Sequence, residues 1–170
     1  MRYRIASAVA VTARLSSPLR TVRGAEAAVG AEWQPAAALP LRLLAERRQA
    51  LGSDGRNAFA LTLHGGVSEL PLPAGLRMDA YAQAGVVGAR SRDLFAEGTL
   101  RASRSLPAGF SLGVAAWGAA QPNVSRLDVG PTLQLPVRAL RTTLLADWRV
   151  RVAGNAGPGS GPAFTLLTDF

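Results

Sequence analysis

The sequence predicts an all-β fold, an antiparallel up-and-down transmembrane β-barrel of about ten strands within a range of eight to twelve. Near the C-terminus, even positions from 140 to 152 are Leu, Thr, Leu, Ala, Trp, Val and Val, whereas odd positions are Arg, Thr, Leu, Asp, Arg and Arg. A period of two with one apolar and one charged face indicates a strand covered on one side. Hydrophobic residues make up 48% of the chain, yet no run approaches the roughly 18 residues of a membrane helix.

Glycine and proline divide the chain into strand-sized segments, because 18 glycines and 11 prolines recur between the alternating stretches. Strands of about nine to thirteen residues, tilted by about 40°, cross the roughly 25 Å apolar band of an outer membrane. Residues with turn chemistry lie at 34–35, 52–55, 71–75, 107–109, 121–123, 136 and 154–162. The expected strands span 2–14, 21–33, 41–50, 57–68, 77–89, 93–105, 109–120, 124–135, 139–152 and 163–170.

The N-terminal stretch allows two interpretations. A basic start followed by residues 5–13 is compatible with a short signal peptide. The same stretch alternates as a strand, with Tyr3, Ile5, Val9 and Val11 in one phase. We favour the strand, which makes the chain the C-terminal part of a longer envelope protein.

The alternation places seven of the ten aromatic residues in the apolar phase, mostly near strand ends, where the aromatic girdles of membrane barrels lie. A soluble β-sandwich that binds an anionic ligand is the alternative, but its large aromatics should gather at core centres. The seven aromatics are Tyr3, Trp33, Phe59, Phe110, Trp148, Phe164 and Phe170. Phe164, Leu166 and the terminal Phe170 also alternate as the assembly signal that barrel-assembly machinery reads.

The opposite face is expected to line a positive lumen. The net charge is +8, and the arginines recur at alternate strand positions rather than in a cluster with interleaved aromatics, which argues against nucleic-acid binding. The lumenal arginines are expected to be Arg42, Arg48, Arg101, Arg126, Arg141, Arg149 and Arg151, and they are partly neutralised by Glu46, Glu97, Asp128 and Asp147. Such a lumen favours anions, anionic saccharides among them, but the same charges are compatible with a salt-bridged plug.

Enzymatic chemistry has little support in the sequence. His64 is the single histidine, and Gly66 stands where the His-x-Ser pattern of outer-membrane lipid A deacylases needs serine. We therefore expect His64 to be a partnered lumenal residue. Cysteine is absent and no carboxylates have ligand spacing, so we expect no metal and no cofactor.

From about residue 24 to the end, short motifs occur in the order found in one family. They are GAEWQP at 30–35, LAERR at 44–48, DAYAQAG at 79–85, LDVGP at 127–131, DWRVRVAG at 147–154 and the closing segment 164–170. In this order and spacing the chain resembles the C-terminal outer-membrane barrel domain of the bacteriophage N4 adsorption protein A family. These are envelope proteins with tetratricopeptide repeats.

The resemblance implies a bacterial outer-membrane barrel linked to exopolysaccharide export, which some phages use for adsorption, and a periplasmic repeat domain upstream. The chain departs from the family before residue 24, where nothing looks like helical repeats, and its loops are shorter. The implied partners are outer-membrane lipid, an anionic polysaccharide and the repeat domain. The resemblance implies no catalytic residues. It implies that the lumen is lined by Glu46, Arg48, Tyr81, Gln83, Asp128, Arg149 and Arg151.

Overall fold

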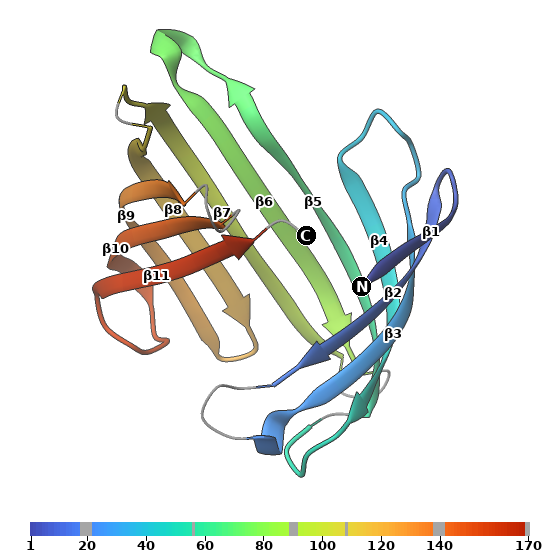
Figure 1. Ribbon diagram of the computed structural model, residues 1–170. Coiled ribbons are helices and arrows are strands. Elements are labelled where there is room, and N and C mark those ends of the chain that lie inside the picture. The colour runs from blue at the N-terminus through green and yellow to red at the C-terminus, as the bar shows by residue number, and fades with distance from the viewer. Residues whose placement is uncertain (18–21, 56, 89–91, 108, 138–141, 169–170) are drawn as a thin grey trace. The chain divides into compact units, whose positions relative to one another are not determined.

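The computed structural model describes residues 1–17, 22–55, 57–88, 92–107, 109–137 and 142–168, and it confirms the all-β prediction. Eleven strands form one sheet in which each strand lies beside its neighbours in sequence, from β1 to β11 (Figure 1). The connection is therefore up-and-down and antiparallel. Closure of the expected barrel is not confirmed, because the sheet order starts at β1 and stops at β11.

Strands β4 and β7 begin and end at the expected residues, and β5, β6 and β8 to β11 lie within three residues of theirs. The strand expected over 21–33 begins only at Glu26, because a 3-10 helix precedes it. Two short 3-10 helices, η1 (Val22–Gly24) and η2 (Pro73–Gly75), lie in connections. In the described part of the chain, no helix has the length and apolar character needed to cross a membrane. The strands are β1 (Arg2–Ala6), β2 (Val9–Ser16), β3 (Glu26–Trp33), β4 (Leu41–Ala50), β5 (Ala58–Pro71), β6 (Arg77–Val87), β7 (Asp93–Ser105), β8 (Ser111–Gln121), β9 (Val124–Val137), β10 (Thr142–Gly154) and β11 (Gly161–Thr168).

The single strand expected over 2–14 is wrong, since this segment forms the hairpin β1–β2. In its register Arg2 lies opposite Thr12 and Tyr3 opposite Val11. Each pair joins two even or two odd positions, so the alternation continues unchanged through the turn. A period of two therefore cannot distinguish this hairpin from one long strand, and neither glycine nor proline marks the turn.

The contacts divide the chain into two compact units. The first comprises residues 1–65 with 83–95, and the second comprises residues 66–82 with 96–170. Strands β1 to β4 belong to the first unit and β8 to β11 to the second, while β5, β6 and β7 contribute segments to both.

In the first unit, the face that is buried carries small and charged side chains, and we call it the first polar face. Its buried members are Ala10, Ala28, Ala60, Thr62, Glu32 and Glu46. The opposite, first apolar face is exposed. Its members on β2 to β5 include Val11, Leu15, Val29, Trp33, Leu41, Phe59, Leu61 and Leu63.

In the second unit, too, the buried face is polar and the exposed face is apolar. Its second polar face buries Arg101, Ser103, Ala115, Trp117, Asp128, Thr132, Leu145 and Asp147. Its second apolar face exposes Leu112, Val114, Leu127, Val129, Trp148, Val150, Val152, Phe164 and Leu166. Trp148 is 54% and Phe164 is 71% exposed, whereas Asp128 is 1% and Asp147 is 4% exposed. Burial is therefore opposite to that of a water-soluble domain, where large apolar side chains fill the core.

Candidate functional site

The candidate site is the pair of polar faces, where each of four buried carboxylates contacts arginine. In the first unit, Glu32 on β3 accepts a hydrogen bond from Nε of Arg2 at 2.7 Å. Nε of Arg42 and Nε2 of His64 lie 3.6 and 3.3 Å from the same carboxylate. His64 is thus the partnered residue of the polar face that we expected.

The second carboxylate of this unit is Glu46 on β4. Nη2 of Arg14 donates to its Oε1 over 2.9 Å, and Nε of Arg48 donates over 2.6 Å. Glu46 lies opposite Gly30 in the register, where an added Cβ would stand 2.9 Å from the Glu46 Cβ and 2.5 Å from a backbone oxygen. Glycine at position 30 therefore provides the space that Glu46 occupies.

Small residues let these arginines reach over a neighbouring strand. Arg14 is on β2 and Glu46 on β4, so the guanidinium crosses β3 at Ala28 and Gly30, which pair with Arg14 and Thr12 of β2 respectively. Arg2 reaches Glu32 of β3 from β1 in the same way, across β2, where Ala10 is fully buried. Ala10 and Ala28 therefore lie on the paths of arginine side chains, which is consistent with their burial on a polar face.

In the second unit the central carboxylate is Asp147 on β10. Oγ1 of Thr132 donates to its Oδ1 over 2.6 Å. Nη2 of Arg149 lies 3.5 Å from Oδ2 and Nη2 of Arg101 lies 3.8 Å from Oδ1. Arg101 also donates from Nε to Thr132 Oγ1 over 3.2 Å. The arginine of β7 crosses β8 to do so, at Ala115, its register partner.

Asp128 on β9 is the fourth buried carboxylate. Nε of Arg126 donates to its Oδ2 over 2.6 Å. The other nitrogens of Arg126 donate to the backbone carbonyls of Pro158 and Gly159, and Arg151 donates to the carbonyl of Ala156 over 2.9 Å. Both arginines therefore hold the connection between β10 and β11, a role that the sequence pattern did not predict.

A hollow of about 260 Å³ opens on the second polar face beside Asp128. The guanidinium carbon of Arg149 lies 4.5 Å from the ring centre of Trp117, a cation–π contact. Oδ1 of Asp128 and Nε of Arg149 are buried without a hydrogen-bond partner among the described residues. The polar and aromatic lining consists of Tyr81, Glu97, Thr99, Trp117, Arg126, Asp128 and Arg149. The hollow therefore has charged and aromatic walls, while the two atoms without a described partner are themselves buried.

The structure groups most of the predicted site residues within the two units. Arg42, Glu46 and Arg48 lie together in the first, and Tyr81, Arg101, Arg126, Asp128, Asp147 and Arg149 lie on the polar face of the second. Arg151 is exposed on β10, and Gln83 is half-buried on β6. Phe164 and Leu166 are exposed on β11. Arg141 and Phe170 lie outside the described residues.

Sequence reasoning missed several partners of these charges. Trp117 is in the opposite phase to Leu112 and Val114, so a strict period of two places it on the polar face. Thr132 lies opposite Asp147, but this pairing depends on register, which the sequence does not give. Arg2, Arg14 and Glu32 were also not among the predicted lumenal residues, although their alternation places them on the charged face.

The described residues contain no group of three or more His, Cys, Asp or Glu side chains suited to hold a metal ion. In comparisons with known proteins, no family model, no curated protein and no solved structure matches the chain.

Proposed function

We propose that this chain forms an outer-membrane β-barrel, inserted by barrel-assembly machinery. The observation that carries the proposal is the inverted burial in both units. Full burial of a Val, Leu or Phe side chain is worth about 1.5–3 kcal/mol, and a face of such side chains in water forgoes that stabilisation at each position. Outer-membrane barrels have an apolar outer band and a polar interior, and the two faces of this sheet have that distribution.

Barrel closure belongs to the same proposal. An open sheet presents unpaired N–H and C=O groups on its first and last strands, which promote aggregation. Pairing of β1 with β11 would remove both edges. In an up-and-down sheet of eleven strands these two run in the same direction, so the closing pair would be parallel. Strands β4 to β10 have the length of a membrane span, since the 13 residues of β10 extend roughly 40 Å, or about 29 Å when tilted by 45°. Strands β2, β3 and β11 are shorter, with eight residues each, and β1 has five.

More specifically, we propose that the chain is the C-terminal pore or anchor domain of an envelope protein of the exopolysaccharide-export or phage-adsorption type. The support is the motif resemblance together with the excess of arginine on the polar faces. In the described part of the first unit, the four arginines Arg2, Arg14, Arg42 and Arg48 share two carboxylates, those of Glu32 and Glu46. A positive interior favours anionic solutes such as acidic saccharides.

A plugged anchor for a periplasmic partner is the second candidate, and a specific observation favours it. The buried carboxylates fix arginine side chains across two or three strands, which fills the polar face with salt bridges. This candidate predicts a folded protein without conductance, whereas the pore predicts anion-selective channels in planar bilayers.

The deciding experiment measures mobility on SDS gels, with and without boiling, after refolding into detergent micelles. A folded membrane barrel should migrate differently before boiling. A chain that shows no shift and is soluble in plain buffer would overturn the membrane proposal and leave a soluble β-sandwich. A chain that shifts should then be tested for conductance to separate pore from anchor.

A further inference from the structure

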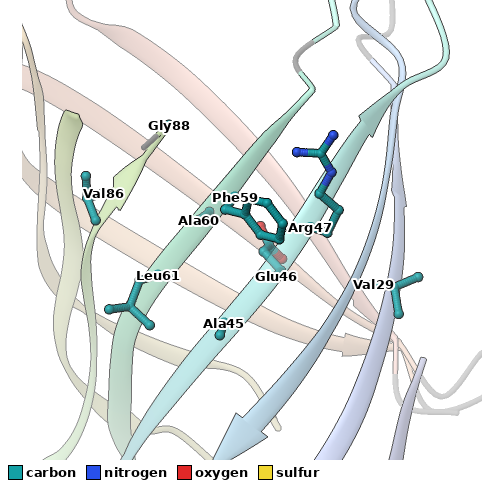
Figure 2. Close-up of a pocket in the computed structure, with 9 residues that line it drawn as sticks. All are labelled: Val29, Ala45, Glu46, Arg47, Phe59, Ala60, Leu61, Val86 and Gly88. Atoms are coloured by element: carbon teal, nitrogen blue, oxygen red, sulfur yellow. The ribbon is translucent and has the colours of Figure 1, made fainter. Parts of the chain in front are cut away.

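A groove of about 480 Å³ lies on the first apolar face. Figure 2 shows its lining, with the side chains of Arg47 and Phe59 beside each other and Leu61 and Val86 on the neighbouring strands. The backbone of β4 and β5 forms part of its floor at Glu46 and Ala60. Its apolar side chains come from β3 to β6 and are Val29, Ala45, Phe59, Leu61 and Val86.

Arg47 is the one charged residue on this face of β2, β3 and β4, where the other described positions carry apolar side chains or Gln49. Its guanidinium carbon lies 4.8 Å from the ring centre of Phe59. Among the described residues, no carboxylate forms an ion pair with it. Arg47 thus differs from Arg14, Arg42 and Arg48, which each contact a buried glutamate.

The position of Arg47 along the strands is that of an interfacial residue. It pairs with Val29 of β3 and Phe59 of β5 in the register. On β4 the same face is apolar from Leu41 to Ala45 and becomes polar at Arg47 and Gln49. Aromatic and basic side chains are typical of this boundary between the apolar band and the polar headgroups.

We propose that this groove binds one anionic phospholipid, with an acyl chain against Val29, Leu61 and Val86 and its phosphate on Arg47. The inference rests on the proposed membrane location. Stacking on Phe59 orients the guanidinium plane, and its N–H groups can then form paired hydrogen bonds with phosphate oxygens. Arg47 lies on an apolar face and has no carboxylate partner among the described residues. Its positive charge is therefore complementary to a lipid headgroup with a net negative charge.

The test measures lipid retention by native mass spectrometry on the full chain, refolded in micelles that contain phosphatidylglycerol or phosphatidylcholine. The wild type should retain phosphatidylglycerol preferentially. Arg47→Gln should weaken its retention roughly tenfold, and Phe59→Leu by a smaller factor of about two to five. The matched control is Arg104→Gln, because Arg104 is also exposed and lies opposite Leu112 on an apolar face, but it does not line this groove.

Heat-modifiable mobility of each variant distinguishes failure of the lipid site from failure of the membrane proposal. If the folded wild type retains both lipids equally, or if Arg47→Gln and Arg104→Gln have the same effect, the lipid site is refuted while the barrel stands. If the wild type gives no heat-modifiable form in any lipid, the membrane proposal fails, and the lipid site fails with it.

Discussion

Replacement of Asp147 by asparagine should strongly destabilise the protein, because Asp147 is the centre of the second polar face. Its side chain is 1% exposed. Asparagine keeps the volume and can still accept the hydrogen bond from Thr132, so the change removes only the charge. Arg101, whose side chain is 11% exposed, then loses its carboxylate partner. Removing one partner of a buried ion pair costs about 3–5 kcal/mol.

The assay is urea unfolding of the refolded chain in detergent micelles, followed by tryptophan emission, to which Trp117 beneath Arg149 contributes. The matched control is Glu69→Gln, since Glu69 pairs with Arg77 but both side chains are more than half exposed. Such surface pairs contribute about 0–1 kcal/mol. If Asp147→Asn changes the free energy of unfolding as little as Glu69→Gln does, the buried charge network is not a source of stability.

Three further tests address the two faces and the lumenal charges. Ala115→Leu should lower the free energy of unfolding by about 1–3 kcal/mol in the same urea assay, because it blocks the path of Arg101 over β8. Ala116→Leu on the apolar face should change it by less than about 0.5 kcal/mol. Equal effects of the two variants would contradict a path of Arg101 across β8 at Ala115. Val114→Arg should destabilise the protein by about 2–4 kcal/mol in lipid bilayers, while a near-neutral effect in plain buffer indicates a water-exposed face. Joint replacement of Arg149 and Arg151 by serine should shift the ion selectivity of any channel in planar bilayers toward cations, and unchanged selectivity counts against a lumenal role for both.

The alternation of side chains was enough to predict which face the carboxylates Glu46, Asp128 and Asp147 occupy. Glu46, Asp128 and Asp147 are buried and partnered, and Trp148 and Phe164 are exposed, as a period of two requires. This success has a simple cause, since successive side chains of a strand point to opposite faces wherever the strand begins or ends. Face assignment is therefore insensitive to errors of two residues at a strand edge.

Contacts across strands could not be predicted, because they depend on register. That Thr132 lies opposite Asp147 follows from the pairing of β9 with β10, which alternation leaves undetermined. The same holds for Arg126 and Arg151, whose side chains reach backbone carbonyls of the β10–β11 connection. The role of Arg47 was also not predicted. Its contact with Phe59 depends on the pairing of β4 with β5, which alternation does not give.

Some arginines of the polar faces are held by carboxylates and others have buried nitrogens without a described partner. This difference would be relevant to the choice between a pore and an anchor if it were confined to one unit. Arg14 and Arg48 are held by Glu46 in short hydrogen bonds, which fix both guanidiniums, although the one carboxylate offsets only one of their two charges. Buried atoms without a described hydrogen-bond partner occur in both units, Nε of Arg42 in the first and Oδ1 of Asp128 and Nε of Arg149 in the second. In the second unit, Trp117 adds an aromatic surface. A network built only to fill space should satisfy its buried polar atoms. Because atoms without a described partner lie in both networks, they do not separate a pore from an anchor. The aromatic and charged lining of the hollow, with Tyr81, Trp117 and Arg149, makes it the place in the second unit to test for saccharide contact.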